Sequence, residues 1–170
     1  VTNLFNQRKL TLDLDTSILR FHKFKESFSI LFIDIDHFKS VNDSYGHLVG
    51  TRILADVAIF FKKTLRPTDL VYRYGGDEFV VILPDTDLAT GSSVGERVLS
   101  NIKNESFYIN ESVKSKKLSV SIGVASFPQN ARDQQEILEI ADKMMYEAKE
   151  TGRGKGTTAN VILPTNNKQV

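Results

Sequence analysis

Two pairs of acidic residues stand beside strongly apolar segments of the chain. Asp34 and Asp36 close an apolar run with the length of a buried strand, and Asp77 and Glu78 follow a pair of glycines. A hairpin beside the first strand would bring these carboxylates together. Hard cations such as Mg²⁺ are usually held by one or two carboxylates and by substrate phosphates. Two such ions can clamp a phosphoryl displacement. The pattern favours a metal-dependent phosphoryl-transfer site, although each pair alone could cap a helix or solvate a turn.

The glycine pair is itself a structural signal. Gly75 and Gly76 separate two short strand-like segments, residues 70–74 and 78–83. Adjacent glycines favour a tight hairpin, because both central positions of such a turn prefer φ > 0. The missing side chains would also let a ligand approach the backbone closely. We therefore expect a hairpin whose turn is open to a ligand.

Hydrophobic spacing predicts the elements that must position these residues. Apolar residues at helical spacing mark the helices, and alternating or compact apolar runs mark the strands. The order of elements fits a central, mainly antiparallel sheet with helices packed on it. Gly152 is expected to end the last helix. The predicted helices cover residues 3–24, 36–45, 49–65, 88–102 and 133–151, and the predicted strands cover 28–35, 70–74, 78–83 and 118–124.

Composition and charge narrow the function classes. The 170 residues are 41% hydrophobic and 25% charged, which suits one domain with a core. The absence of cysteine excludes a disulfide scaffold, a thiolate metal site and a cysteine nucleophile. A net charge of +1 disfavours DNA or RNA binding by bulk charge. The apolar runs are too short to span a membrane, so no membrane contact is expected of this domain. The chain begins with Val rather than Met, and we expect a fragment of a longer protein.

Several segments together resemble the GGDEF family of diguanylate cyclases. Residues 73–79, which read RYGGDEF, resemble the motif that names the family. The correspondence runs in order over nearly the whole chain. The other matching segments are residues 2–8 (TNLFNQR), 34–43 (DIDHFKSVND), 121–124 (SIGV) and 141–149 (ADKMMYEAK).

The resemblance implies an α/β (α+β) fold with a central, mainly antiparallel sheet flanked by helices, similar to the nucleotidyl cyclase core and the polymerase palm. Members of the family condense two GTP into cyclic di-GMP and release two pyrophosphates. One subunit binds one nucleotide, so catalysis would require a homodimer. We expect residues 1–156 to form the catalytic domain and 157–170 a C-terminal tail, with an upstream regulatory domain missing from this chain. The domain would be cytoplasmic, in a protein that could be anchored to a membrane.

The resemblance also implies the metal centre. The cofactor would be Mg²⁺, two ions per half-site, with Mn²⁺ as an alternative. Asp77 would help to deprotonate the ribose 3′-OH that attacks the α-phosphate in the facing subunit. The implied catalytic residues are Asp34, Asp77 and Glu78, and the implied metal ligands are these three carboxylates and the carbonyl of Ile35.

The nucleotide and product sites carry over in the same way. The first backbone amides of a helix have no partner within the helix and favour anions, and lysine and arginine side chains attract phosphate by their charge. The residues implied at the phosphates are Lys39, Lys149, Arg153 and the amides of His37 and Phe38. The residues implied at the base and ribose are Asn42, Thr51, Gly75 and Gly76. The residues implied at a product-inhibition site are Arg66, Asp69 and Arg97, although Arg97 could equally be an ordinary surface arginine.

Thr51 is the departure from the family pattern that matters most. The family normally has Asp at this position, and a carboxylate accepts two hydrogen bonds from guanine N1–H and N2–H₂. A threonine hydroxyl cannot match that pair, and losing such a contact is worth about 1–3 kcal/mol of discrimination. A hydroxyl can also donate, so adenine N1 is no longer excluded. Two outcomes stay open: weaker GTP binding alone, or use of GTP with ATP to make cyclic GMP-AMP.

Two other functions compete with the cyclase. A catalytically degenerate module could bind GTP or cyclic di-GMP through Arg66 and Asp69, although degenerate members usually lose the acids that are intact here. An unrelated palm-like nucleotide transferase is a weaker alternative. Assays of product formation, product binding and primer extension separate the three.

Overall fold

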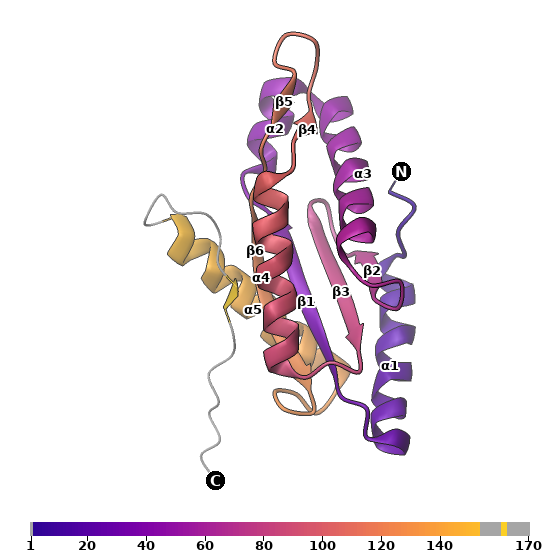
Figure 1. Ribbon diagram of the computed structural model, residues 1–170. Helices are drawn as coiled ribbons and strands as arrows, with labels where there is room; N and C mark the ends of the chain where they lie inside the picture. Colours follow the sequence, from indigo (N-terminus) through magenta and orange to yellow (C-terminus); the bar gives the residue numbers. More distant parts are fainter. Residues whose placement is uncertain (1, 154–160, 163–170) are drawn as a thin grey trace.

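A computed structural model describes residues 2–153 and 161–162 of the chain. A five-stranded sheet runs through its centre, in the order β2-β3-β1-β6-β7 (Figure 1). The strands are β1 (Phe28–Ile35), β2 (Leu70–Arg73), β3 (Glu78–Pro84), β6 (Val120–Phe127) and β7 (Val161–Ile162). The first four of these pair antiparallel, and β7 pairs parallel with β6. The predicted mainly antiparallel sheet is therefore confirmed, while the strand at β7 was not predicted.

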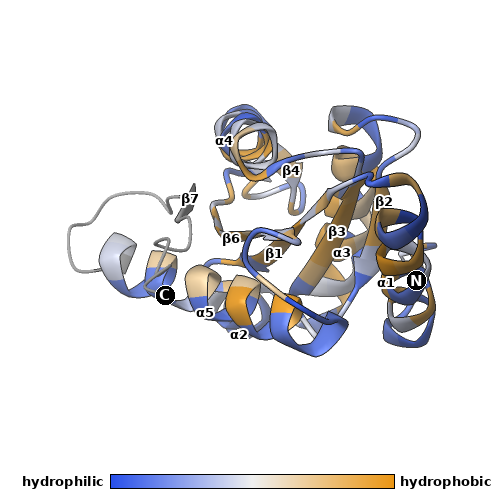
Figure 2. Cartoon of the chain, turned by 90° about the horizontal axis from the view of Figure 1, so that it is seen from below, coloured by the Kyte–Doolittle hydropathy of each residue, from blue (hydrophilic) through white to orange (hydrophobic). Residues whose placement is uncertain are grey.

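Five helices cover the sheet. Those on one face are α3 (His47–Thr64) and α4 (Leu88–Asn104), with α2 (Phe38–Tyr45) beside α3, and those on the other face are α1 (Gln7–Phe24) and α5 (Gln134–Arg153). A small hairpin of β4 (Phe107–Tyr108) and β5 (Ser115–Lys116) follows α4. The strands β1 and β6, which lie between α4 and α5, are buried along their whole length (Figure 2). Among the described residues, no helix is both long and apolar enough to cross a membrane.

Alternation along β1 divides the core into two clusters. Leu31, Ile33 and Ile35 face α3 and α4, whereas Phe28, Ile30 and Phe32 face α1 and α5. Because successive side chains of a strand point to opposite faces, Asp34 belongs to the face that α5 covers. β1 has neighbours on both sides, so this carboxylate stands at the end of the central strand.

Some predicted boundaries differ from the structure, whereas the predicted break near Gly46 is confirmed. The first helix begins at Gln7 rather than residue 3, because the Asn6 side chain caps it by accepting from the Lys9 amide at 3.0 Å. The last helix runs through Gly152 to Arg153, so Gly152 does not end it. Gly46, with φ of 83°, separates α2 from α3. A β-carbon is poorly tolerated at that φ, so glycine suits the break between the two helices.

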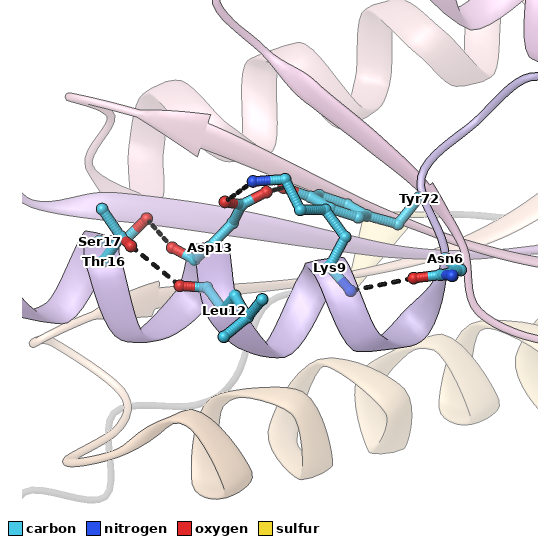
Figure 3. A network of polar contacts seen from close by, with 7 residues as sticks. All are labelled: Asn6, Lys9, Leu12, Asp13, Thr16, Ser17 and Tyr72. Atoms are coloured by element: carbon cyan, nitrogen blue, oxygen red, sulfur yellow. Dashed lines mark hydrogen bonds and ion pairs between the residues drawn. The ribbon is translucent and has the colours of Figure 1, made fainter.

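A polar network joins α1 to the edge of the sheet (Figure 3). The buried Tyr72 of β2 donates its hydroxyl to Asp13 Oδ2 at 2.6 Å, and Lys9 Nζ lies 2.6 Å from Asp13 Oδ1. Burial raises the pKa of Tyr72, and its bond to the Asp13 carboxylate raises it further. The phenol therefore stays a donor, which fixes α1 against β2.

Candidate active site

The two predicted acid pairs meet across neighbouring strands. Asp34 of β1 is directly opposite Glu78 of β3, and the Ile35 amide donates to the Asp77 carbonyl at 3.2 Å. Directly opposite residues of an antiparallel pair project to the same face. The hairpin thus brings Asp77 and Glu78 to the end of β1, as the sequence predicted.

Asp34 is the most buried of these carboxylates. Its Oδ1 is buried and lies 2.7 Å from Lys149 Nζ of α5, with which it forms an ion pair. Burial raises the pKa of Asp34 to about 6, Lys149 opposes that rise, and the negative charges of Asp77 and Glu78 add to it. The charges of three carboxylates and one ammonium therefore act on one another here.

The glycine turn is shaped by Glu78 rather than by left-handed backbone. The amides of Tyr74 and Gly75 both donate to the Glu78 carbonyl, at 2.9 and 3.3 Å. Gly46 is the one glycine with positive φ among the described residues, so the expectation of φ > 0 at Gly75 and Gly76 is wrong. A β-carbon at Gly75 would instead overlap Oε2 of Glu78, whereas one at Gly76 would meet no atom within 4 Å.

Arg73 holds this turn from the preceding strand. Its Nε donates to the Gly75 carbonyl at 3.2 Å and its Nη2 to the Gly76 carbonyl at 2.8 Å. A guanidinium presents several donors in one plane, which suits two successive carbonyls. The turn that carries Asp77 is therefore braced from its own hairpin.

The donor set fits Mg²⁺ that arrives with a phosphate ligand. Among residues 2–153 and 161–162, no group of three or more His, Asp or Glu side chains forms a metal cage by itself. Mg²⁺ rarely uses such cages and is usually held by one or two carboxylates with water and phosphate oxygens. The buried Asp34 Oδ1, beside the charges of Asp77 and Glu78, supplies a hard oxygen donor of this kind.

A cavity of about 550 Å³ opens beside the carboxylates, between α2, α3 and the hairpin turn. Asp77 and Gly76 line the end of the cavity that is nearest the other two carboxylates, Asp34 and Glu78. Asp34, Glu78 and Lys149 meet next to the cavity rather than in its wall. Its lining residues are Phe38, Lys39, Asn42, Asp43, His47, Thr51, Leu54, Arg73, Gly76 and Asp77.

The wall between α2 and α3 holds the predicted base contacts. A β-carbon at Gly50 would overlap the Asn42 side chain, so the absence of a side chain there lets Asn42 lie against α3. Thr51 follows Gly50 directly and lines the same cavity. The buried side chains of Phe38 and Leu54 supply an apolar surface beside these polar groups.

The predicted phosphate contacts are only partly brought together. Lys39 lines the cavity, while Lys149 is paired with Asp34. α2 begins at Phe38, and its N-cap residue His37, with φ of 56°, makes no side-chain capping bond. The first amides of a helix lack intrahelical partners and suit an anion. Arg153 closes α5, and its side chain lies outside the described residues.

The three residues of the predicted product site also lie together. Asp69 Oδ2 accepts from the Arg66 amide at 2.8 Å, and the Asp69 amide donates to the Arg66 carbonyl at 3.0 Å. Burial raises the pKa of Asp69, while this hydrogen bond and the charges of Arg66 and Arg97 oppose the rise. Arg97 of α4 is thus near enough to act on Asp69.

Sequence reasoning missed several residues of the site. Asp43, His47 and Arg73 line the cavity without having been assigned a role. For Asp43, helical spacing was a usable signal, because Lys39 and Asp43 are four residues apart on α2. Asp142 of α5 was also missed; burial is the main cause of the raised pKa of Glu78, and the Asp142 charge is the next.

Asp36 has a structural role instead. It accepts from the hydroxyls of Ser119 and Ser121, both at 2.7 Å, and so connects the end of β1 to β6. Neither Asp34 nor Asp36 caps α2, whose N-cap residue is His37. Of the two acids that close the first strand, Asp34 alone is directed to the carboxylate cluster.

Comparison with known proteins agrees with this geometry. The family model described as "Diguanylate cyclase, GGDEF domain" matches residues 1–155. The probable diguanylate cyclase DgcT of Escherichia coli is 36% identical over 162 residues, which are 95% of this chain and 35% of that protein. Diguanylate cyclase A of Treponema denticola is 39% identical over 140 residues, 82% of this chain and 37% of that protein. The chain therefore spans little more than a third of these relatives.

Solved structures show the same fold. The crystal structure of the GGDEF domain of YfiN (TpbB) from Pseudomonas aeruginosa has a TM-score of 0.88 at 29% identity, covering 98% of this chain and all of that one. The coiled coil and GGDEF domain of DgcB from Caulobacter crescentus, in complex with c-di-GMP, has a TM-score of 0.83 at 25% identity. That match covers 96% of this chain and 83% of the other.

Proposed function

Because the chain belongs to the GGDEF family of diguanylate cyclases, we propose that it condenses two GTP into cyclic di-GMP and releases two pyrophosphates. One observation carries the proposal. The carboxylates of Asp34, Asp77 and Glu78 meet at the end of β1 and β3, beside a cavity that Lys39 and Asn42 line. The proposal assigns the carboxylates to metal, Lys39 to phosphate and Asn42 to the base, and their common location supports this assignment.

The metal ligands of this proposal are Asp34, Asp77, Glu78 and the Ile35 carbonyl, holding Mg²⁺ or Mn²⁺. When bound, the ions neutralise the phosphate charge and stabilise the attacking and leaving oxygens of an in-line displacement. Asp77 lines the cavity and takes the proton of the ribose 3′-OH. Lys39, Lys149, Arg153 and the first amides of α2 bind the triphosphate.

Each condensation step balances within two nucleotides. The 3′-oxygen of one GTP bonds to the α-phosphorus of the other, the bond from that phosphorus to the β-phosphate bridging oxygen breaks, and pyrophosphate leaves. A second, reciprocal step closes the ring. The cavity of about 550 Å³ suits one nucleotide, so the two GTP are held by two copies of the chain facing each other.

A second candidate function is the use of GTP with ATP to make cyclic GMP-AMP. Thr51 favours it, because this side chain lines the base end of the cavity where the family has a carboxylate. The hydroxyl cannot accept from both guanine N1–H and N2–H₂, and it can donate to adenine N1. The product ratio from mixed GTP and ATP separates the two candidates.

Product inhibition is a further part of the proposal. Arg66, Asp69 and Arg97 would hold cyclic di-GMP, with Asp69 reading guanine N1–H and N2–H₂ and Arg66 the opposite edge. The proximity of the three side chains supports this role. The related DgcB structure contains c-di-GMP.

The family match also supports the proposed domain boundaries. Residues 1–156 would form the catalytic domain, against a family match over residues 1–155, and 157–170 a C-terminal tail from which β7 joins the sheet. GTP is a cytoplasmic nucleotide, so we expect the domain to act in the cytoplasm. An upstream regulatory domain that brings two copies together completes the proposal.

The test is a condensation assay on the chain fused to a dimeric coiled coil. The protein is incubated with Mg²⁺ and GTP, alone or with ATP, and nucleotides are separated by chromatography. Asp77→Asn should abolish turnover, while Asp85→Asn, at an exposed site beyond the other end of β3, should leave it unchanged. EDTA should stop the reaction and excess Mg²⁺ restore it.

Three results would overturn parts of the proposal. Cyclic di-GMP binding without any turnover would favour the degenerate binding module. Full activity of Asp77→Asn would exclude the proposed acid–base role. Extension of a nucleic-acid primer would point to a palm-like transferase instead.

A further inference from the structure

The β4–β5 hairpin contacts both helices that form the α2–α3 wall of the cavity, and it lies beside α2 in Figure 1. Arg52 of α3 donates through Nη2 to the Tyr108 carbonyl at 3.2 Å and to the Ile109 carbonyl. The Arg52 guanidinium also lies 4.9 Å from the centroid of the Tyr108 ring. From the other strand, Lys116 Nζ lies 5.8 Å from the centroid of the Tyr45 ring at the end of α2. The hairpin therefore joins α2 to α3 by a route separate from the chain between them.

The hairpin is anchored in the core. Phe107 of β4 and Ile109, which follows β4, are both buried and belong to the hydrophobic cluster that α3 and α4 cover. An isolated two-stranded hairpin is only marginally stable in water, so its position depends on contacts of this kind. The hairpin is thus a fixed support for the two helices.

The junction between α2 and α3 needs such a support. α2 has eight residues, and a helix of that length depends on packing against its surroundings. Gly46 separates the two helices with φ of 83°, and a β-carbon there would meet no atom within 4 Å. Packing at the junction itself therefore does not fix the angle between the helices. Contacts on either side of the junction must fix it.

The hairpin contacts are next to the residues assigned to the base. Arg52 directly follows Thr51 on α3, and Tyr45 lies three residues beyond Asn42 on α2. Among the residues that the structure describes, Arg52 is not one of those that line the cavity. Its effect on a bound nucleotide must then pass through the helices.

We propose that Arg52 is a positioning residue, which holds α2 against α3 through the β4–β5 hairpin and so sets the shape of the cavity that receives the purine base. A guanidinium has several donors in one plane and a face that stacks on an aromatic ring, so it can hold two successive carbonyls and Tyr108 together. Lys116 adds a second, weaker connection at Tyr45. A cavity that is fixed before binding loses less freedom when the nucleotide enters.

This inference rests on the proposed nucleotide site, and binding tests it without turnover. The dissociation constant of a non-hydrolysable GTP analogue is measured by calorimetry with Mg²⁺ on the whole chain. The variants are Arg52→Ala, Arg52→Lys and Lys116→Ala. Lys117→Ala is the matched control, because Lys117 belongs to the same segment but donates to the Asn104 carbonyl of α4, at 2.5 Å. Amide hydrogen exchange of each variant reports the local stability of α2.

Arg52→Ala should weaken binding of the analogue about fivefold, because two hydrogen bonds and a ring contact are lost. Lys116→Ala should weaken it about twofold. Arg52→Lys separates positioning from charge. It keeps the positive charge but cannot hold both carbonyls and the ring, so it should still weaken binding about threefold. Exchange should become faster in α2 and in the first turns of α3, with no change in α1 or α5.

The outcomes are distinguishable. A wild-type chain that does not bind the analogue refutes the proposed function and this inference with it. A wild-type chain that binds it while Arg52→Ala binds equally well refutes the inference alone. Full recovery in Arg52→Lys, or an equal loss in Lys117→Ala, would make the effect one of charge and refute positioning. Faster exchange throughout the molecule would show general destabilisation and refute it as well.

Discussion

Lys149 Nζ lies 2.7 Å from Oδ1 of Asp34, so the last helix supplies the counter-ion for a carboxylate at the end of the central strand. Both side chains are largely removed from water. Removing one member of a buried pair leaves the other charge uncompensated, which is more damaging than removing both. This pairing governs stability as well as the proposed chemistry.

Lys149→Met should therefore lower the free energy of unfolding by about 3 kcal/mol. Adding Asp34→Asn to Lys149→Met should recover most of that loss. Urea denaturation in EDTA measures both changes without any contribution from bound metal. Additive losses in the double variant would show that the two side chains do not depend on each other.

Gly75→Ala should reduce turnover at least tenfold with little change in stability. A β-carbon at this position would overlap the Glu78 carboxylate. The carboxylate can move away at low energetic cost, but it then no longer lies beside the other proposed metal ligands. Gly76→Ala is the matched control, because its β-carbon meets no atom within 4 Å. Condensation assays should rank wild type, Gly76→Ala and Gly75→Ala in that order. The reverse order for the two variants would contradict this role of Gly75.

Gly123→Ala should instead lower stability, by about 3 kcal/mol. A β-carbon on β6 at this point would overlap the backbone of α5 at Ala141 and Met145, which cannot rotate aside. The helix must then move off the sheet. Thermal and urea unfolding of Gly123→Ala and Gly76→Ala test this, and an unchanged midpoint for Gly123→Ala would disprove the close contact.

Thr51→Asp should raise selectivity for GTP over ATP. The substitution places at residue 51, on the cavity wall, the carboxylate that the family normally has there, and one bidentate contact is worth about 1–3 kcal/mol of discrimination. With equal GTP and ATP, the share of mixed product should fall. An unchanged product ratio means that residue 51 does not read the base.

Cyclic di-GMP affinity at the Arg66 site should fall as the pH is lowered toward the pKa of Asp69. Acceptance from two guanine donors needs the ionised carboxylate, and burial raises the pKa of Asp69 above its ordinary value. The loss should therefore begin at a higher pH than for an unshifted carboxyl. Calorimetry across pH measures it, with Asp69→Asn as the control whose weak binding should not vary in this range.

Periodicity was sufficient to predict the sheet and its main helices. Apolar spacing predicted α3 and α5 because each helix buries one face, whereas β6 is buried along its whole length and alternates because apolar residues are interleaved with serine, glycine and alanine. The hairpin between β2 and β3 was also predictable from its glycines. Boundaries failed where a side chain decides them, as Asn6 does at the start of α1.

The site was less predictable than the fold. Three features of the site depend on contacts between residues that are distant or irregularly spaced in the sequence. Gly75 makes room for Glu78, and Gly50 makes room for Asn42. Ser119 and Ser121 donate to Asp36. Such contacts produce no periodic pattern in the sequence, so they could not be predicted from it. The motif indicated which residues belong to the site, and the packing of α2 against α3 showed that Asp43 stands among them.

The distance along the chain between Asp34 and Lys149 has a consequence for synthesis. A ribosome makes β1 and the hairpin of β2 and β3 early, but α5 emerges after every other helix. Until then the growing chain has the acidic cluster without the lysine that pairs with Asp34. On the proposed mechanism, a nascent or prematurely ended chain makes no second messenger, and signalling starts only with a finished domain.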